Sequence, residues 1–254
     1  MGTYALTGAA SGIGASLAAL LREQGHEVIN VDLRDADINA DLASAAGRQA
    51  AIAGVRERAP GGLDGLIPLA GVGGGGPPGT LITAVNYFGT VEVVAGLREL
   101  VSRKQGAIVL LCSNSAPMSS PEDPLITSLL EGDEVAALKI AAEHDNGMHY
   151  MAGKRALAYW MRRNTMAYAR DGIRMNAVAP GPVDTPMTRP LYDNPEMAEV
   201  MRHLIDNTPL GRAGQPREIA RTINFLLGPE SSYVCGSVLY VDGGYDAHVR
   251  SDHI

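Results

Sequence analysis

The chain has 254 residues, 46% of them hydrophobic and 19% charged, with a formal net charge of −7 at pH 7. This composition is typical of a globular protein and argues against a disordered chain. Binding nucleic-acid phosphates requires a basic face, so the acidic balance argues against a nucleic-acid partner. Because no run of 18 apolar residues occurs, we also expect no membrane span.

Short apolar runs alternate with helical patterns along the whole chain. Runs such as Ile108–Leu111 are apolar at every position, as strands buried on both faces of a parallel sheet are. The alternation predicts a doubly wound α/β sheet with helices on both faces, and the lack of a linker predicts one domain over residues 1–254. Strands are expected near residues 3–6, 27–33, 65–70, 107–113, 173–180 and 237–243.

The N-terminus reads as the first strand and lacks a charged leader, which favours a cytoplasmic protein. Cys112 and Cys235 are far apart and form no C-x-x-C pair. This pattern predicts two reduced thiols and no metal site.

A glycine-rich turn, "TGAASGIG", joins the first strand to the first helix. Gly8, Gly12 and Gly14 allow a tight turn and a close backbone approach to a pyrophosphate, which the following helix N-terminus attracts. The spacing differs from the common G-x-G-x-x-G fingerprint, but its place between strand and helix predicts dinucleotide binding.

Asp32 ends the second strand, where an acidic residue commonly binds the adenosine ribose hydroxyls. A carboxylate there repels a 2′-phosphate, so it favours NAD and makes NADP the weaker alternative. Arg34 lies two residues on and blurs this preference. The other interpretation makes Asp32 an ordinary turn residue at the end of a strand.

The segment 117–147 breaks the alternation of strands and helices. Asp123-Pro124 and Asp133 are typical of helix N-termini, and apolar stripes follow both. The segment predicts an inserted helical hairpin immediately before "HYMAGK", which sets Tyr150 and Lys154 four residues apart. Residues four apart share a helix face, so the pair is either an acid–base device or two surface side chains.

Together, "TGAASGIG", Asp32 and "YMAGK" make the chain resemble the short-chain dehydrogenase/reductase family over nearly its whole length. The resemblance implies a Rossmann-type fold and an NAD-dependent oxidoreductase of secondary alcohols and ketones. Further motifs match in order at Asp41-Leu42, Ala70-Gly71, Asn86–Gly89, Ile108–Ser115, Arg174–Pro186 and Tyr240–Gly244.

The resemblance also assigns roles to individual residues. It implies a catalytic tetrad of Asn86, Ser113, Tyr150 and Lys154, with Ser115 as the alternative serine. The alcohol needs a base, and an ammonium about 4 Å from a tyrosine lowers the pKa of its hydroxyl by about three units. The implied cofactor-binding residues are Gly8, Ser11, Gly12, Ile13, Gly14, Asp32, Asp41, Leu42, Ala70, Gly71, Tyr150, Lys154, Pro180, Gly181, Val183 and Thr185.

The chain departs from the family pattern at two places. Pro68 and Leu69 replace two polar residues before Ala70-Gly71, which puts the usual side-chain support of the central strands in doubt. The insertion 117–147 precedes a helix that many relatives use to form tetramers. We therefore expect a homo-oligomer that is a dimer, with Tyr240–Tyr245 as a candidate surface.

The substrate lid is expected at residues 187–208. Met187, Leu191, Met197 and Met201 either contact an apolar substrate or form the core face of the lid. Within the family, the chain looks most like bacterial 3α-hydroxysteroid dehydrogenase/carbonyl reductases. The predicted substrate is a 3α-hydroxysteroid or a similar hydrophobic alcohol. The alternatives are a carbonyl reductase for other hydrophobic ketones and a catalytically silent dinucleotide-binding regulator.

Overall fold

The structure is a computed structural model that describes residues 1–73, 76–143 and 147–252. In this part of the chain, a seven-stranded sheet has the order β3-β2-β1-β4-β5-β6-β7, and every neighbouring pair is parallel. The predicted Rossmann-type parallel sheet is therefore confirmed. The strands are β1 Thr3–Thr7, β2 Glu27–Asp32, β3 Ile38–Asn39, β4 Gly65–Pro68, β5 Ala107–Leu111, β6 Arg174–Pro180 and β7 Val238–Val241.

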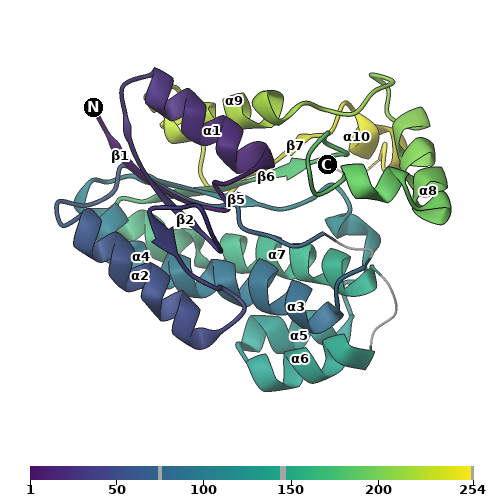
Figure 1. Ribbon diagram of the computed structural model, residues 1–254, viewed down its shortest axis with the longest axis horizontal. Coiled ribbons are helices and arrows are strands. Elements are labelled where there is room, and N and C mark those ends of the chain that lie inside the picture. The colour runs from purple at the N-terminus through teal and green to yellow at the C-terminus, as the bar shows by residue number, and fades with distance from the viewer. Residues whose placement is uncertain (74–75, 144–146, 253–254) are drawn as a thin grey trace.

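Helices cover both faces of the sheet, and each face has its own buried core (Figure 1). Helices α1 and α9 pack together on one face, while α2, α4 and α7 cover the other. The central strands are apolar on both sides because both sides meet helices. The bounds of these five helices are α1 Gly12–Glu23, α2 Ala45–Arg58, α4 Gly89–Arg103, α7 Met148–Arg170 and α9 Pro216–Leu227.

The remaining helices lie at the margins of these layers. Helix α3 leads into α4, and α8 and α10 lie together at the end of the molecule shown on the right of Figure 1. Their bounds are α3 Gly79–Thr83, α8 Pro195–Asp206 and α10 Tyr245–Val249.

The order in which strands are added reverses at the centre of the sheet. From β1, the first strands add on one side through β2, and the later strands add on the other side through β4. In sheets of this kind a crevice opens outside the carboxyl ends of the strands at this switch point. The topology therefore places the turn after β1, Asp32 at the end of β2, and the segment after β4 around one crevice.

The inserted hairpin is confirmed as helices α5, Pro124–Glu131, and α6, Glu134–Glu143. Asp123 caps α5 by accepting a hydrogen bond from the Leu125 N–H at 2.9 Å. The turn at Gly132 has a φ of 77°, which a side chain would strain. Helix α5 packs on α7, and α6 packs on α3. Residues 144–146 of the predicted insertion lie outside the described residues.

A π-helical turn, Ala84–Phe88, separates α3 from α4 and carries Asn86. The described stretch Gly79–Arg103 that includes it is long and apolar enough for a membrane span. Its most apolar window is 61% buried inside the protein, however, and α4 packs on α2, β4 and β5. Core helices pass the same test, so this is weak evidence for a span.

Truncating the hairpin core should show that the insertion is part of the folded unit. Leu125 is fully buried, so Leu125→Ala should lower the free energy of unfolding by about 2–5 kcal/mol. Val135, on α6, is 82% exposed, and Val135→Ala should change it by less than about 0.5 kcal/mol. Urea titrations of both variants measure this, and equal, small effects would mean that the hairpin is not packed on the domain.

Candidate active site

The glycine turn holds the start of α1 against the end of β1. Gly8 and Gly12 have φ angles of 74° and 54°, which other residues rarely adopt. A Cβ atom at Gly14 would lie 2.0 Å from the carbonyl oxygen of Gly8, so only glycine fits there. Ser11 is the N-cap of α1 but makes no side-chain cap hydrogen bond, and it lines the pocket.

The Asp32 carboxylate is fixed at the edge of the same pocket. Its Oδ2 accepts a hydrogen bond from the Ala10 N–H at 2.9 Å, and its Oδ1 accepts one from the Leu33 N–H at 2.7 Å. Arg34 is exposed and does not line the pocket. The carboxylate keeps further lone pairs for ligand hydroxyls.

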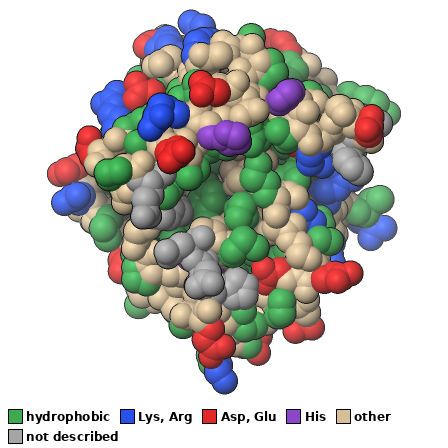
Figure 2. Space-filling view, turned by 90° about the vertical axis from the view of Figure 1, so that its right-hand side faces the viewer, with side chains coloured by type: hydrophobic (Ala, Val, Ile, Leu, Met, Phe, Trp, Pro, Cys, Tyr) green, Lys and Arg blue, Asp and Glu red, His purple; other side chains and the backbone are tan. Residues whose placement is uncertain are grey.

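A pocket of about 410 Å³ runs along the carboxyl ends of the strands. Figure 2 shows this side of the molecule hollowed near its centre, with hydrophobic side chains gathered around the hollow. Apart from Lys154, every residue predicted to bind the cofactor lines this pocket. Of the predicted catalytic residues, Ser113 and Tyr150 line it directly.

The catalytic end of the pocket forms where β5 meets α7. Lys154 is buried, and its Nζ donates a hydrogen bond to the carbonyl oxygen of Leu111 at 2.7 Å. The same Nζ lies 5.7 Å from the centre of the Tyr150 ring, and Tyr150 hydrogen bonds to the Ser113 side chain. The Tyr150–Lys154 pair therefore faces the interior and is not a pair of surface side chains.

The two candidate serines occupy different places. Ser113 lines the pocket, whereas Ser115 supports it from behind: the two hydroxyls lie 2.9 Å apart, and the Ser115 N–H donates to Ser113 Oγ at 3.2 Å. The geometry favours Ser113 as the residue that contacts a ligand.

Burial governs the pKa values of the pair. It raises the pKa of the Tyr150 hydroxyl, although the hydrogen bond with Ser113 opposes the shift. It also lowers the pKa of Lys154 to about 8. The net shift of the Tyr150 pKa is therefore upward, opposite to the expected lowering, because desolvation is the largest influence on Tyr150 and the Lys154 ammonium donates to Leu111.

Asn86 lies behind the pocket. Its side chain grips the backbone of Val72, accepting from the Val72 N–H at 2.7 Å and donating to the Val72 carbonyl at 2.9 Å. Its own carbonyl accepts a hydrogen bond from the Thr90 hydroxyl. The contacts in the structure therefore make Asn86 a support for the segment after β4.

Pro68 and Leu69 cannot provide side-chain hydrogen bonds to support the central strands, and other groups provide this support. The Thr7 hydroxyl accepts a hydrogen bond from the Ala70 N–H at 3.1 Å, while the Thr7 carbonyl accepts one from the Leu69 N–H. Leu69 itself is buried and lines the pocket. An apolar residue is tolerated there because backbone groups and Thr7 supply the hydrogen bonds.

Among the apolar residues singled out in the predicted lid, Met187 lines the pocket. Met201 is buried, and Leu191 and Met197 are half-buried outside the pocket. Met187 is thus placed where it could contact a substrate, which stays a prediction, while Met201 is a buried residue of the lid. Sequence reasoning gave no pocket role to Leu33, Ala40, Leu69, Val72, Leu81, Val85, Leu111, Cys112, Pro186 and Thr188.

A signal for most of these residues was present, because they adjoin predicted site residues at strand ends. Val85 adjoins the predicted residue Asn86, whereas Leu81 carried no such signal. They come from α3 and the π-helical turn, whose approach to the pocket depends on packing against the hairpin.

Comparison with known proteins identifies the family. The short chain dehydrogenase model matches residues 3–125, and the model described as enoyl-(acyl carrier protein) reductase matches residues 133–246. The chain is 36% identical to the 3-alpha-hydroxysteroid dehydrogenase/carbonyl reductase of Comamonas testosteroni, with 98% of each chain covered. It belongs to the short-chain dehydrogenase/reductase family.

Two further relatives support the same assignment. The crystal structure of the 3-alpha-hydroxysteroid dehydrogenase from Pseudomonas sp. B-0831, complexed with NADH, superposes with a TM-score of 0.95 at 43% identity, covering 99% of this chain and 100% of that one. The cis-4-hydroxycyclohexanecarboxylate dehydrogenase of Sinomonas cyclohexanicum is 34% identical over 95% of both chains. This short-chain dehydrogenase/reductase is thus an oxidoreductase acting on hydroxyl or carbonyl groups.

Burial of Lys154 should make stability depend on pH. Its pKa is about 8 in the folded protein and 10.5 ordinarily, so between these values the unfolded chain binds more protons. The free energy of unfolding should therefore rise with pH, by about 2 kcal/mol between about pH 8 and 10.

Urea titrations of the wild-type protein and Lys154→Met across this range measure the effect. The wild type should gain stability relative to the variant as the pH rises. Lys139 is exposed on α6, so Lys139→Met serves as the control and should follow the wild type. Parallel pH dependences of wild type and Lys154→Met would contradict the prediction.

Proposed function

We propose that the protein is an NAD-dependent oxidoreductase that interconverts a secondary alcohol and a ketone, with a 3α-hydroxysteroid or a similar hydrophobic ring alcohol as substrate. The observation that carries the proposal is one pocket with Asp32 at one end and Ser113, Tyr150 and buried Lys154 at the other. The first end suits binding of an adenosine ribose, and the second suits removal of a proton from an alcohol.

The residues of the pocket fit a dinucleotide. The positive φ angles of Gly8 and Gly12 and the close approach of Gly14 to the Gly8 carbonyl make a tight turn at the start of α1, and a helix N-terminus suits a pyrophosphate. The Asp32 carboxylate suits ribose hydroxyls and repels a 2′-phosphate, which supports NAD over NADP. Thr185 and the backbone near Val183 line the pocket beyond, where they would hold a carboxamide. When bound, NAD supplies the hydride acceptor.

The chain's own residues handle the proton and the substrate oxygen. Ser113 would hold the substrate oxygen, since its hydroxyl faces the pocket and Ser115 fixes its position. Tyr150 would take the alcohol proton, or return it in the reverse direction. Lys154 would keep a cation beside the tyrosine and bind a ribose hydroxyl, and Asn86 would hold the wall formed by Val72.

The substrate end of the pocket is apolar. Leu81, Val85 and Met187 line it, and methionine adapts to irregular apolar ligands. The names of the Comamonas and Sinomonas relatives both describe dehydrogenases of ring-bearing hydroxy compounds. Reduction of other hydrophobic ketones is the second candidate activity, because the same apolar wall accepts them. Retention of both Tyr150 and Lys154 argues against a silent regulator.

We also propose a cytoplasmic homodimer, each protomer a single domain. The hairpin packs on α7, the helix that relatives use for tetramers, and so stands in the way of that contact. Tyr245 of the expected surface Tyr240–Tyr245 is buried, but the neighbouring residues Leu239 and Tyr233 at the β7 edge of the sheet keep 40% and 103% of their full surface. Sedimentation of a concentration series tests this: a monomer or tetramer at every concentration would contradict it.

The proposed activity can be tested by NADH absorbance on mixing the protein with NAD⁺ and a 3α-hydroxysteroid. Tyr150→Phe should lower kcat about 10²–10⁴-fold, because the variant keeps the ring but cannot take the proton. Parallel samples carry the 3β epimer, simple secondary alcohols and NADP⁺. Turnover of other alcohols alone would keep the mechanism and contradict the steroid, and full turnover by Tyr150→Phe would contradict the mechanism.

The two serines should differ in the same assay. Ser113→Ala removes the donor to the substrate oxygen and should lower kcat about 100-fold or more. Ser115→Ala removes an equal volume but only a supporting contact, so it should lower kcat less than about tenfold. Equal losses, or a larger loss for Ser115→Ala, would contradict the assignment of Ser113.

A further inference from the structure

Arg48 is a fully buried cation away from the catalytic residues. It lies on α2 with only 1% of its surface exposed, and it contacts groups from three other segments. Its Nε donates to Glu92 on α4 at 2.8 Å, and its Nη2 donates to Glu134 on α6 at 2.7 Å. The two carboxylates keep a third of their side-chain surface exposed, so Arg48 is the enclosed centre of the cluster.

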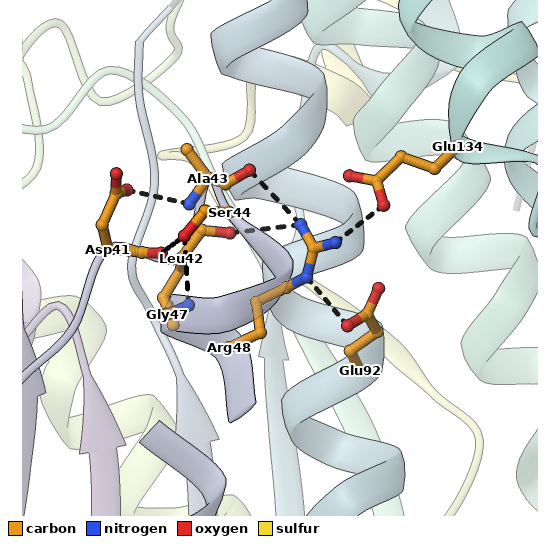
Figure 3. Close-up of polar contacts among 8 residues, drawn as sticks. All are labelled: Asp41, Leu42, Ala43, Ser44, Gly47, Arg48, Glu92 and Glu134. Carbon is orange, nitrogen blue, oxygen red and sulfur yellow. Dashed lines mark hydrogen bonds and ion pairs between the residues drawn. The ribbon is translucent and has the colours of Figure 1, made fainter. Parts of the chain in front are cut away.

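The remaining arm of the guanidinium points to the segment 42–43, which adjoins the cofactor pocket. Its Nη1 donates to the carbonyl oxygens of Leu42 and Ala43, at 3.5 Å and 3.4 Å. Figure 3 shows the guanidinium between the two carboxylates on one side and these carbonyls on the other. Leu42 and its neighbour Asp41 line the pocket at the Asp32 end. Arg48 therefore holds the wall that an adenine ring would contact.

This wall has little freedom to move. A Cβ atom at Gly47 would lie 1.9 Å from the Asp41 carbonyl oxygen, and one at Gly89 would lie 3.1 Å from the Leu42 Cβ. The segment is thus wedged between α2 and the start of α4. The Ser44 hydroxyl donates to the Asp41 carbonyl at 3.2 Å and adds a further restraint. A shift of the guanidinium would be passed on to Asp41 and Leu42.

Glu134 connects the Arg48 cluster to the inserted hairpin, a distant part of the sequence. It begins α6 of the inserted hairpin and lies 86 residues from Arg48 in the sequence. The other end of α6 packs on α3, which carries Leu81 of the substrate wall. The hairpin therefore contacts elements behind both ends of the pocket: α3 at the end with Leu81, and Arg48, through an ion pair, at the Asp32 end.

We propose that Arg48 is a positioning residue that sets the affinity for the adenosine half of NADH, and that the inserted hairpin acts on cofactor binding through Glu134. The proposal rests on the proposed NAD-dependent function. Weakening either partner of the Arg48–Glu134 pair shifts the cation, and the tightly packed Asp41–Leu42 wall shifts with it, while Tyr150, Ser113 and Lys154 keep their own contacts with β5 and α7.

Calorimetric titration with NADH and with 5′-AMP tests the proposal, since 5′-AMP carries only the adenosine half. Glu134→Gln and Arg48→Lys keep nearly the original volume and should each raise the Kd for both ligands by the same factor, fivefold or more, in line with typical coupling between sites of about 5–150-fold. Their kcat at saturating NADH should stay within about twofold of wild type. Glu99→Gln, which removes a carboxylate from an exposed pair with Arg103 on α4, is the control and should bind like wild type.

Each result has a distinct meaning. Folded Glu134→Gln and Arg48→Lys proteins that bind 5′-AMP like wild type would overturn the proposal and leave the proposed function intact. A fall in melting temperature and kcat with an unchanged Kd for 5′-AMP would make the cluster merely structural and overturn it as well. A wild-type protein that binds neither ligand would overturn the proposed function together with this proposal.

Discussion

Burial of the Lys154 ammonium is the interaction on which the rest of the site depends. Enclosing a cation is costly unless hydrogen-bond acceptors surround it, and here the Leu111 carbonyl at the end of β5 supplies one at 2.7 Å. That bond ties α7 to the sheet. It thereby sets Tyr150, one turn earlier on the same helix, beside Ser113 just beyond the same strand. Burial in this arrangement lowers the pKa of Lys154 and raises the pKa of the Tyr150 hydroxyl.

The same principle operates at the other end of the pocket. There the buried cation is Arg48, and the backbone that it fixes is the wall at Leu42. Two buried cations thus each hold backbone carbonyls beside one end of the pocket. The inserted hairpin packs on the helix of the first cation and pairs with the second. It lies outside the sheet but is tied to both ends of the site.

Sequence motifs predicted those features of the site that depend only on the backbone geometry of neighbouring residues. The glycine turn, Asp32 at a strand end and the four-residue spacing of Tyr150 and Lys154 each follow from strand, turn or helix period, and the structure brings them together. The hairpin was predictable from its caps at Asp123 and Asp133. Long-range contacts were not: the Arg48–Glu134 pair joins residues 86 apart, and the pKa of Tyr150 depends on burial and on where Lys154 points. The π-helical turn that carries Asn86 also left no periodic signal.

The central claim is that one pocket orders a dinucleotide from Asp32 to Tyr150. A crystal structure of the protein with NADH tests it most directly. We expect ribose hydroxyls within hydrogen-bond distance of the Asp32 carboxylate, adenine against Leu42, and the nicotinamide between Tyr150 and Thr185. NADH bound in the reverse orientation, or outside the pocket lined by Gly8 and Gly12, would contradict the account.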